Sequence, residues 1–313
     1  MTRSTPTTER ITTSPDRRRD RTGRGVLCAA VVLVLAAGSA VAWGWWTGSL
    51  GGVPIRPHCT ATALGSTTEL DPEQAGNAAI IAGVAIRRSL PARAATIGIA
   101  TALQESKLVN VSGGDRDSIG LFQQRPSQGW GTLAEVHDPV YATNAFYDVL
   151  VKIEGYQNLP ITKAAQQVQR SAFPSAYASH EPEARVWAST LAGHSPTGLN
   201  CVLTAPPDLP RGTRGSDGLT ERTRAVKAAA RKELGRNAVG ADARGTTLRF
   251  GAAKSEPTRI AWSVAQWAVA RADALDIVAV EVEGKQWRRD RSTKGWRPLS
   301  GGPTQGQVVV RVA

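Results

Sequence analysis

The sequence predicts an α+β fold in which an apolar N-terminal helix precedes a mainly α-helical domain and a smaller α+β domain. Three observations predict it. No charged residue occurs between residues 25 and 55, helix-start signals recur between the second and third cysteines, and short apolar strands alternate with helical segments after residue 219. At 313 residues the chain is long enough for two domains of ordinary size.

The N-terminus predicts a membrane anchor. Residues 1–24 are rich in Arg, Thr and Ser and should form a disordered basic tail. Segment 25–46 is the predicted anchor, and as a helix its stretch Val26–Trp46 would be about 31 Å long, which matches the hydrocarbon core of a bilayer. The basic flank places the tail in the cytoplasm and the rest of the chain outside the cell membrane as a single-pass protein. The alternative is secretion after signal cleavage near Ala42; the long apolar stretch and its tryptophan cluster favour the anchor.

The net charge and the cysteines restrict the function further. A formal charge of +12 favours a polyanionic partner such as anionic wall polymer, anionic lipid or nucleic acid. Nucleic acid is disfavoured because no known binding signature is present. Cys28 lies in the apolar segment, so we expect Cys59 and Cys201 to form a disulfide that contributes about 2–4 kcal/mol. Two cysteines without clustered histidines predict no metal site.

Helix-start signals divide the segment 59–201. Asp-Pro pairs, isolated prolines and one threonine predict five helices. The helices begin at Pro72, Pro91, Pro139, Thr162 and Pro182. The first is expected to end near Arg88, the second at Glu105 and the fifth at Gly193. The irregular segment Val109–Gly131 between the second and third helices is expected to hold at most a short hairpin.

The C-terminal part begins after a linker at residues 202–218, which is rich in Pro, Gly and charge. The α+β domain of residues 219–313 should contain a helix with Val226 and Leu234 and a second helix at 259–274. Strands are expected at 246–250, 277–283 and 307–312, with a Trp-bearing turn before the last one.

Glu105 is the first candidate for catalysis. It follows the run Ala92–Gln104, which has a single charge near its start, so its helix should be mostly buried. Apolar surroundings and the negative end of the helix dipole both favour a protonated carboxyl. Such a carboxyl can act as a general acid. The alternative is a glutamate that ends a helix beside Lys107.

The irregular segment supplies the other candidates. Asp115 and Asp117 are expected to serve as turn residues; the alternative is a second catalytic carboxylate, which most glycoside hydrolases place about 5–9.5 Å from the first. The alternation Gly120–Gln123 predicts that Gln123 points into a groove, where an amide suits hydroxyl and N-acetyl groups. Trp130, between two glycines, would stack on a sugar or anchor the core.

The stretches ALQES (102–106) and SIGLFQQ (118–124) resemble the paired signatures of the soluble lytic transglycosylase and goose-type lysozyme group. The resemblance covers about residues 59–201 and implies a lysozyme-like domain. It implies that Glu105 is the acid/base for the bond between N-acetylmuramic acid and N-acetylglucosamine, that Ser106 orients substrate or Glu105, and that no cofactor is needed. The implied substrate-binding loop contributes Ser118, Gly120, Gln123 and Gln124, flanked by Leu121 and Phe122.

One signature of that group is absent. Its Ala-Tyr-Asn-x-Gly stretch, whose Tyr contacts the catalytic Glu, is replaced here by AAQQVQRSAFPSAYA (164–178). Gln169, Tyr147 and Tyr177 are the alternatives for this role. The C-terminal stretch 267–299 resembles zinc D-Ala-D-Ala peptidase-like domains, but no histidine follows His194, so we expect no metal there.

Two function classes follow. The first is a membrane-anchored, extracytoplasmic enzyme that cleaves peptidoglycan glycan strands with Glu105. The second is a non-catalytic wall-binding or scaffold protein that keeps the lysozyme-like groove. Both predict peptidoglycan as the partner, with anionic wall polymers as a further one, a membrane contact through residues 25–46, and no nucleic acid.

Overall fold

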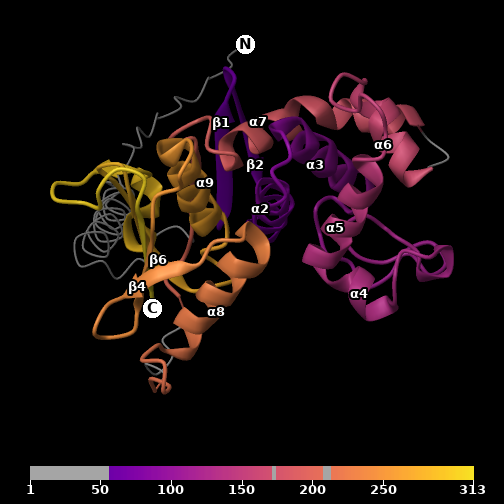
Figure 1. Cartoon of the computed structure of the whole chain (residues 1–313). Coiled ribbons are helices and arrows are strands. Elements are labelled where there is room, and N and C mark those ends of the chain that lie inside the picture. The colour runs from indigo at the N-terminus through magenta and orange to yellow at the C-terminus, as the bar shows by residue number, and fades with distance from the viewer. Residues whose placement is uncertain (1–55, 171–173, 207–212) are drawn as a thin grey trace, which may run out of the picture. The chain divides into compact units, whose positions relative to one another are not determined.

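The computed structural model describes residues 56–170, 174–206 and 213–313. They belong to one compact unit, Ile55–Ala313, of mixed α and β structure with two sheets (Figure 1). Among these residues, no helix combines the length and apolar character needed to cross a membrane. The predicted basic tail and membrane anchor, residues 1–24 and 25–46, lie outside the described part of the chain.

The helices of the first part begin where their capping residues predict. Asp71 and Gln74 form a capping box, and the side chain of Asp138 accepts hydrogen bonds from the Val140 and Tyr141 N–H groups. The five predicted helices are α2 (Pro72–Arg87), α3 (Ala92–Ser106), α5 (Pro139–Leu150), α6 (Ile161–Gln169) and α7 (Glu181–Leu191). The short helix α4 (Leu133–His137) and the 3-10 helix η2 (Pro174–His180) were not expected.

Helix α3 is the centre of this part. Every residue from Ala94 to Leu103 is buried, and the helix contacts α2, α5, α6 and α7. It ends at Ser106, and the residue that caps it, Lys107, adopts a left-handed backbone with φ 57°. The prediction of a buried helix ending at Glu105 is therefore confirmed, and the carboxyl stands where the helix leaves the core.

A three-stranded antiparallel sheet joins the two ends of the helical segment, and the sequence reasoning missed it. Strand β1 (His58–Ala63) lies between β2 (Ser66–Leu70) and β3 (Leu199–Val202). Cys59 is paired with Cys201 in the register of β1 and β3, and the predicted disulfide joins them. Both cysteines are fully buried.

The C-terminal part contains a six-stranded antiparallel sheet in the order β4-β5-β9-β6-β7-β8. The expected strands are β5 (Thr247–Phe250), β6 (Ile277–Val282) and β9 (Val308–Val312), and the expected second helix is α9 (Pro257–Ala270), which contacts β6 and β9. The Trp-bearing turn is instead strand β7 (Lys285–Arg288) with a buried Trp287. Strands β4 (Ala238–Ala241) and β8 (Arg297–Pro298) were also missed.

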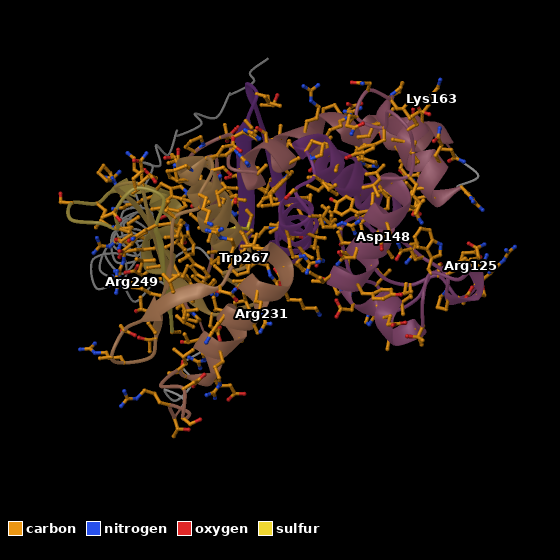
Figure 2. The ribbon with its side chains drawn as sticks, in the orientation of Figure 1. Arg125, Asp148, Lys163, Arg231, Arg249 and Trp267 are labelled. Atoms are coloured by element: carbon orange, nitrogen blue, oxygen red, sulfur yellow. A yellow bond between two sulfur atoms is a disulfide. The ribbon has the colours of Figure 1, made fainter. Side chains whose placement is uncertain are left out.

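Helix α8 (Glu221–Ala229) continues into the π-helical turn η3 (Ala230–Leu234), and η3 and α9 both contact α2. The Glu233 carboxylate is buried here and accepts hydrogen bonds from Trp267 Nε1 at 2.6 Å and from the Arg271 guanidinium at 3.1 Å. Burial raises the pKa of Glu233, although both donors oppose the shift. Trp267 is labelled in Figure 2. The C-terminal part is thus packed against the helix that adjoins α3.

Candidate functional site

Glu105 lies in the last turn of α3 and is partly exposed, whereas the preceding helix is buried. Its Oε1 accepts a hydrogen bond of 2.6 Å from the hydroxyl of Tyr177, which belongs to η2 and is fully buried. A buried phenol that donates to a partly exposed carboxyl fixes the direction of that carboxyl. Among the described residues, no hydrogen bond to the other carboxyl oxygen is found.

Tyr177 therefore takes the position that the sequence left open among three residues. Tyr147 is fully buried on α5, and its hydroxyl donates to the Ile81 carbonyl at 3.1 Å. Burial raises the pKa of Tyr147, so its phenol stays neutral. Gln169 reaches the loop instead of the carboxyl, because its Nε2 donates to the Phe122 carbonyl at 2.7 Å. Neither replaces the Tyr177 contact.

Two side chains hold the Gly-Leu-Phe-Gln loop against the helices. Ser106 Oγ donates to the Leu121 carbonyl at 2.8 Å and also lies 3.1 Å from the Ala102 carbonyl of its own helix. Gln169 holds the next carbonyl, that of Phe122. Ser106, predicted to orient substrate or Glu105, thus positions the loop beside Glu105.

The loop packs inward more fully than its sequence indicated. Leu121 and Phe122 are both fully buried, so the expected alternation of inward and outward residues is not found. Phe122 stacks on Phe146 of α5 with ring centroids 4.7 Å apart. Gly120 has φ 77°, and a Cβ at this position would lie 2.8 Å from the Val136 carbonyl oxygen. The glycine is therefore required by both backbone angle and space.

Three residues predicted to bind substrate form hydrogen bonds within the protein. Ser118 is buried, and its hydroxyl lies 2.7 Å from the Asp115 carbonyl oxygen and 3.1 Å from the Gln123 Oε1, while the Gln123 Nε2 donates to the Gly120 carbonyl at 3.3 Å. Gln123 itself has φ 48°. Gln124 is 2% exposed, and its Nε2 donates to the Ala142 carbonyl. Gln123, which was expected to point into a groove, is partly exposed and its amide also braces the loop.

The two aspartates of the segment differ in surroundings. Asp117 accepts hydrogen bonds from the Ser127 N–H at 2.8 Å, the Arg125 Nε at 2.8 Å and the Ser127 hydroxyl at 3.0 Å. These donors, the Ser127 backbone first, lower the pKa of Asp117 well below its usual range. Asp115 is largely exposed beside Arg116. Asp117 is thus a turn residue, as expected; Arg125 is labelled in Figure 2.

A pocket of about 470 Å³ lies where α6 ends against the loop. Trp130 contributes a partly buried indole, and Gln169 and Arg170 stand at the end of α6. The structure thus brings together Trp130 and Gln169, which the sequence named separately. The remaining lining residues are Gln128, Gly129, Val149 and Val168.

His180 is a neighbour of the site that the sequence reasoning missed. Its Nε2 donates to the Gln104 Oε1 at 3.1 Å, one residue before Glu105. Burial, and secondarily the charge of Lys107, lower the pKa of His180. The only sequence signal for it was its place after the Tyr177 stretch, at the start of α7.

Within the described ranges, no group of three or more His, Cys, Asp or Glu side chains is placed to hold a metal ion. The site thus consists of one carboxyl with a phenol partner, a braced loop and an adjoining pocket.

In comparisons with known proteins, no family model and no curated protein sequence matches the chain.

Proposed function

We propose that this chain is a membrane-anchored, extracytoplasmic enzyme that cleaves the bond between N-acetylmuramic acid and N-acetylglucosamine in peptidoglycan, with Glu105 as general acid/base. The observation that carries the proposal is the 2.6 Å hydrogen bond from the buried Tyr177 hydroxyl to Glu105. This hydrogen bond holds the Glu105 carboxyl in the last turn of α3. The carboxyl lies beside the loop that Ser106 and Gln169 hold in place. The resemblance of ALQES and SIGLFQQ to lytic transglycosylases supports the same assignment.

In the proposed reaction, Glu105 gives its proton to the glycosidic oxygen as the bond to the muramic acid C1 breaks. The sugar's 6-hydroxyl then attacks C1, and Glu105 takes the hydroxyl proton, which leaves an anhydro end and restores the acid. If water attacks instead, the product is a hydrolysed end. One carboxyl suffices in either case, because the substrate's own acetamido group can stabilise the positive charge at C1.

A wall-binding protein without turnover is the second candidate. It is favoured by the inward hydrogen bonds of Ser118, Gln123 and Gln124, which occupy groups that the enzyme hypothesis assigned to substrate. Trp130 and the pocket beside it would serve glycan binding equally well. The two candidates differ only in whether Glu105 transfers a proton.

The test is release of soluble muropeptides from purified peptidoglycan by the full chain in detergent. Wild type is compared with Glu105→Gln and with Glu154→Gln, a matched control at an exposed glutamate after α5. We expect Glu105→Gln to abolish release and Glu154→Gln to leave it unchanged. Anhydro ends by mass analysis would identify a lytic transglycosylase. Wild-type protein that binds insoluble wall without releasing fragments would leave the second candidate.

A further inference from the structure

We propose that the pocket lined by Trp130, Gln169 and Arg170 binds an N-acetylated sugar carrying a carboxylate, and that Arg170 recognises the carboxylate. The inference rests on the proposed function, because it assigns one sugar unit of the same glycan strand to this pocket. Arg170 would then determine which strands the site accepts, apart from the chemistry at Glu105.

The pocket is linked to the end of α3 through the Gly-Leu-Phe-Gln loop. Ser106, the residue after Glu105, holds the Leu121 carbonyl, and Gln169 holds the carbonyl of Phe122. Neighbouring residues are about 3.8 Å apart along a chain, so the two anchors are separated by one residue of the loop. In this proposal, a strand bound at Glu105 continues past the loop to the pocket that Gln169 lines.

The size and lining suit a sugar. A volume of about 470 Å³ lies within the usual range for small-molecule sites. Trp130 supplies a flat apolar surface, and Val149 and Val168 complete an apolar wall. An indole face suits the apolar face of a pyranose ring, since both are broad and neither needs a hydrogen bond there.

Gln169 supplies a specific polar contact. Its Nε2 is used by the Phe122 carbonyl, but its Oε1 is buried and has no hydrogen-bond partner among the described residues. A buried acceptor without a donor is unfavourable, so a ligand that brings an N–H or O–H to it gains affinity once the amide turns toward the pocket. The acetamido N–H of an N-acetylated sugar is a donor of that kind.

Arg170 supplies the charge. It directly follows α6 with φ 52°, is exposed, and makes no ion pair within the described ranges. Arg125 of the adjoining loop is different, because Asp117 accepts from its Nε at 2.8 Å. An unpaired guanidinium at a pocket rim matches a carboxylate, which it can bind through two parallel hydrogen bonds.

Two parts of a wall strand carry such a carboxylate. On strands without peptides it is the free lactyl group of muramic acid; on substituted strands that group is an amide, and the carboxylates belong to the peptide stem. Chitin oligosaccharides have the same acetamido groups and no carboxylate. These three ligands therefore separate the charge contact from the sugar contact and identify which carboxylate Arg170 meets.

The experiment measures binding of these three soluble oligosaccharides, of equal sugar number, to the full chain carrying Glu105→Gln, which keeps the ligands uncleaved. Arg170→Asn is added because asparagine tolerates a left-handed backbone. We expect it to weaken binding of one or both acidic ligands by about tenfold or more and to leave chitin binding unchanged. Arg170→Lys should restore part of the affinity. Lys163→Gln, at an exposed site on the same helix outside the pocket, is the matched control and should change nothing (Lys163 is labelled in Figure 2).

The inference is overturned if Arg170→Asn weakens all three ligands equally, or none, or if no ligand binds. Because binding is measured without cleavage, its outcome is separate from that of the proposed function. Charge-selective binding with no muropeptide release by wild type would refute the enzyme and keep the subsite. Release that depends on Glu105 but binding that ignores Arg170 would refute only the subsite.

Discussion

Replacing Tyr177 by phenylalanine tests the central contact of the site with one atom. The change removes the hydroxyl that donates to Glu105 at 2.6 Å and leaves the buried ring in place. Removing one partner of such a hydrogen bond costs about 1–3 kcal/mol, and about 1.4 kcal/mol corresponds to a tenfold change. Glu105 is partly exposed, so water can replace some of the loss. We therefore expect kcat to fall about tenfold or more, with KM nearly unchanged because Tyr177 contacts the carboxyl and not the sugar.

Tyr147→Phe is the matched control, since it removes another fully buried hydroxyl, one that donates to the Ile81 carbonyl. We expect it to lower the free energy of unfolding by about 1–3 kcal/mol and to leave kcat unchanged. The assay is initial-rate muropeptide release, with urea unfolding of each variant to show that it is folded. A folded Tyr177→Phe protein with the wild-type rate would refute the positioning role, as would an equal loss in both variants.

Three further changes test the fold around the site. Replacing Cys59 and Cys201 by alanine opens a loop with a sequence separation of 142 residues, for which chain entropy predicts a loss of at most about 5 kcal/mol in urea unfolding; a loss under about 1 kcal/mol would contradict the entropic argument. Gly120→Ala, at φ 77° and with its Cβ 2.8 Å from a carbonyl oxygen, should cost about 1–3 kcal/mol by the same measurement and reduce cleavage, and an unchanged midpoint would show that the loop can shift. His180 has a lowered pKa in the folded protein, so its contribution to stability is present above its unfolded pKa of about 6.5 and is lost as the pH falls. Unfolding free energies between about pH 8 and pH 5 should therefore decline less in His180→Gln than in wild type, and parallel declines would exclude this residue as the cause.

The helices could be predicted because their signals are local. Asp71 and Asp138 cap the helices that follow them, and prolines occupy the first helical positions. The pairing of β1 with β3 could not, because its register joins residues about 140 positions apart, such as Cys59 and Cys201, whereas the β1–β2 hairpin is local, with Ala63 opposite Ser66. The predicted disulfide indicated that these ends meet, but no local pattern indicated that they meet as strands.

The site was predictable only in part. Glu105 stands out because one carboxylate follows a long uncharged run, and its loop is marked by glycines. The choice of Tyr177 over Tyr147 depended on packing, since both are buried tyrosines and only the contacts of their hydroxyls distinguish them. The hydrogen bonds of Gln123 within the loop accompany a positive φ, a backbone state that its residue type does not predict.

The glycines on α2 limit how the two parts of this chain can evolve. A Cβ at Gly83 would lie 3.0 Å from a Leu234 methyl group and 3.2 Å from the Glu233 carbonyl oxygen, and one at Gly76 would lie 3.3 Å from the Arg271 guanidinium. A side chain at Gly83 would therefore act as a wedge between α2 and η3. The C-terminal part cannot be exchanged for an unrelated domain without new residues on α2, so the stretch from the first strand to the last would be inherited and recombined as one piece.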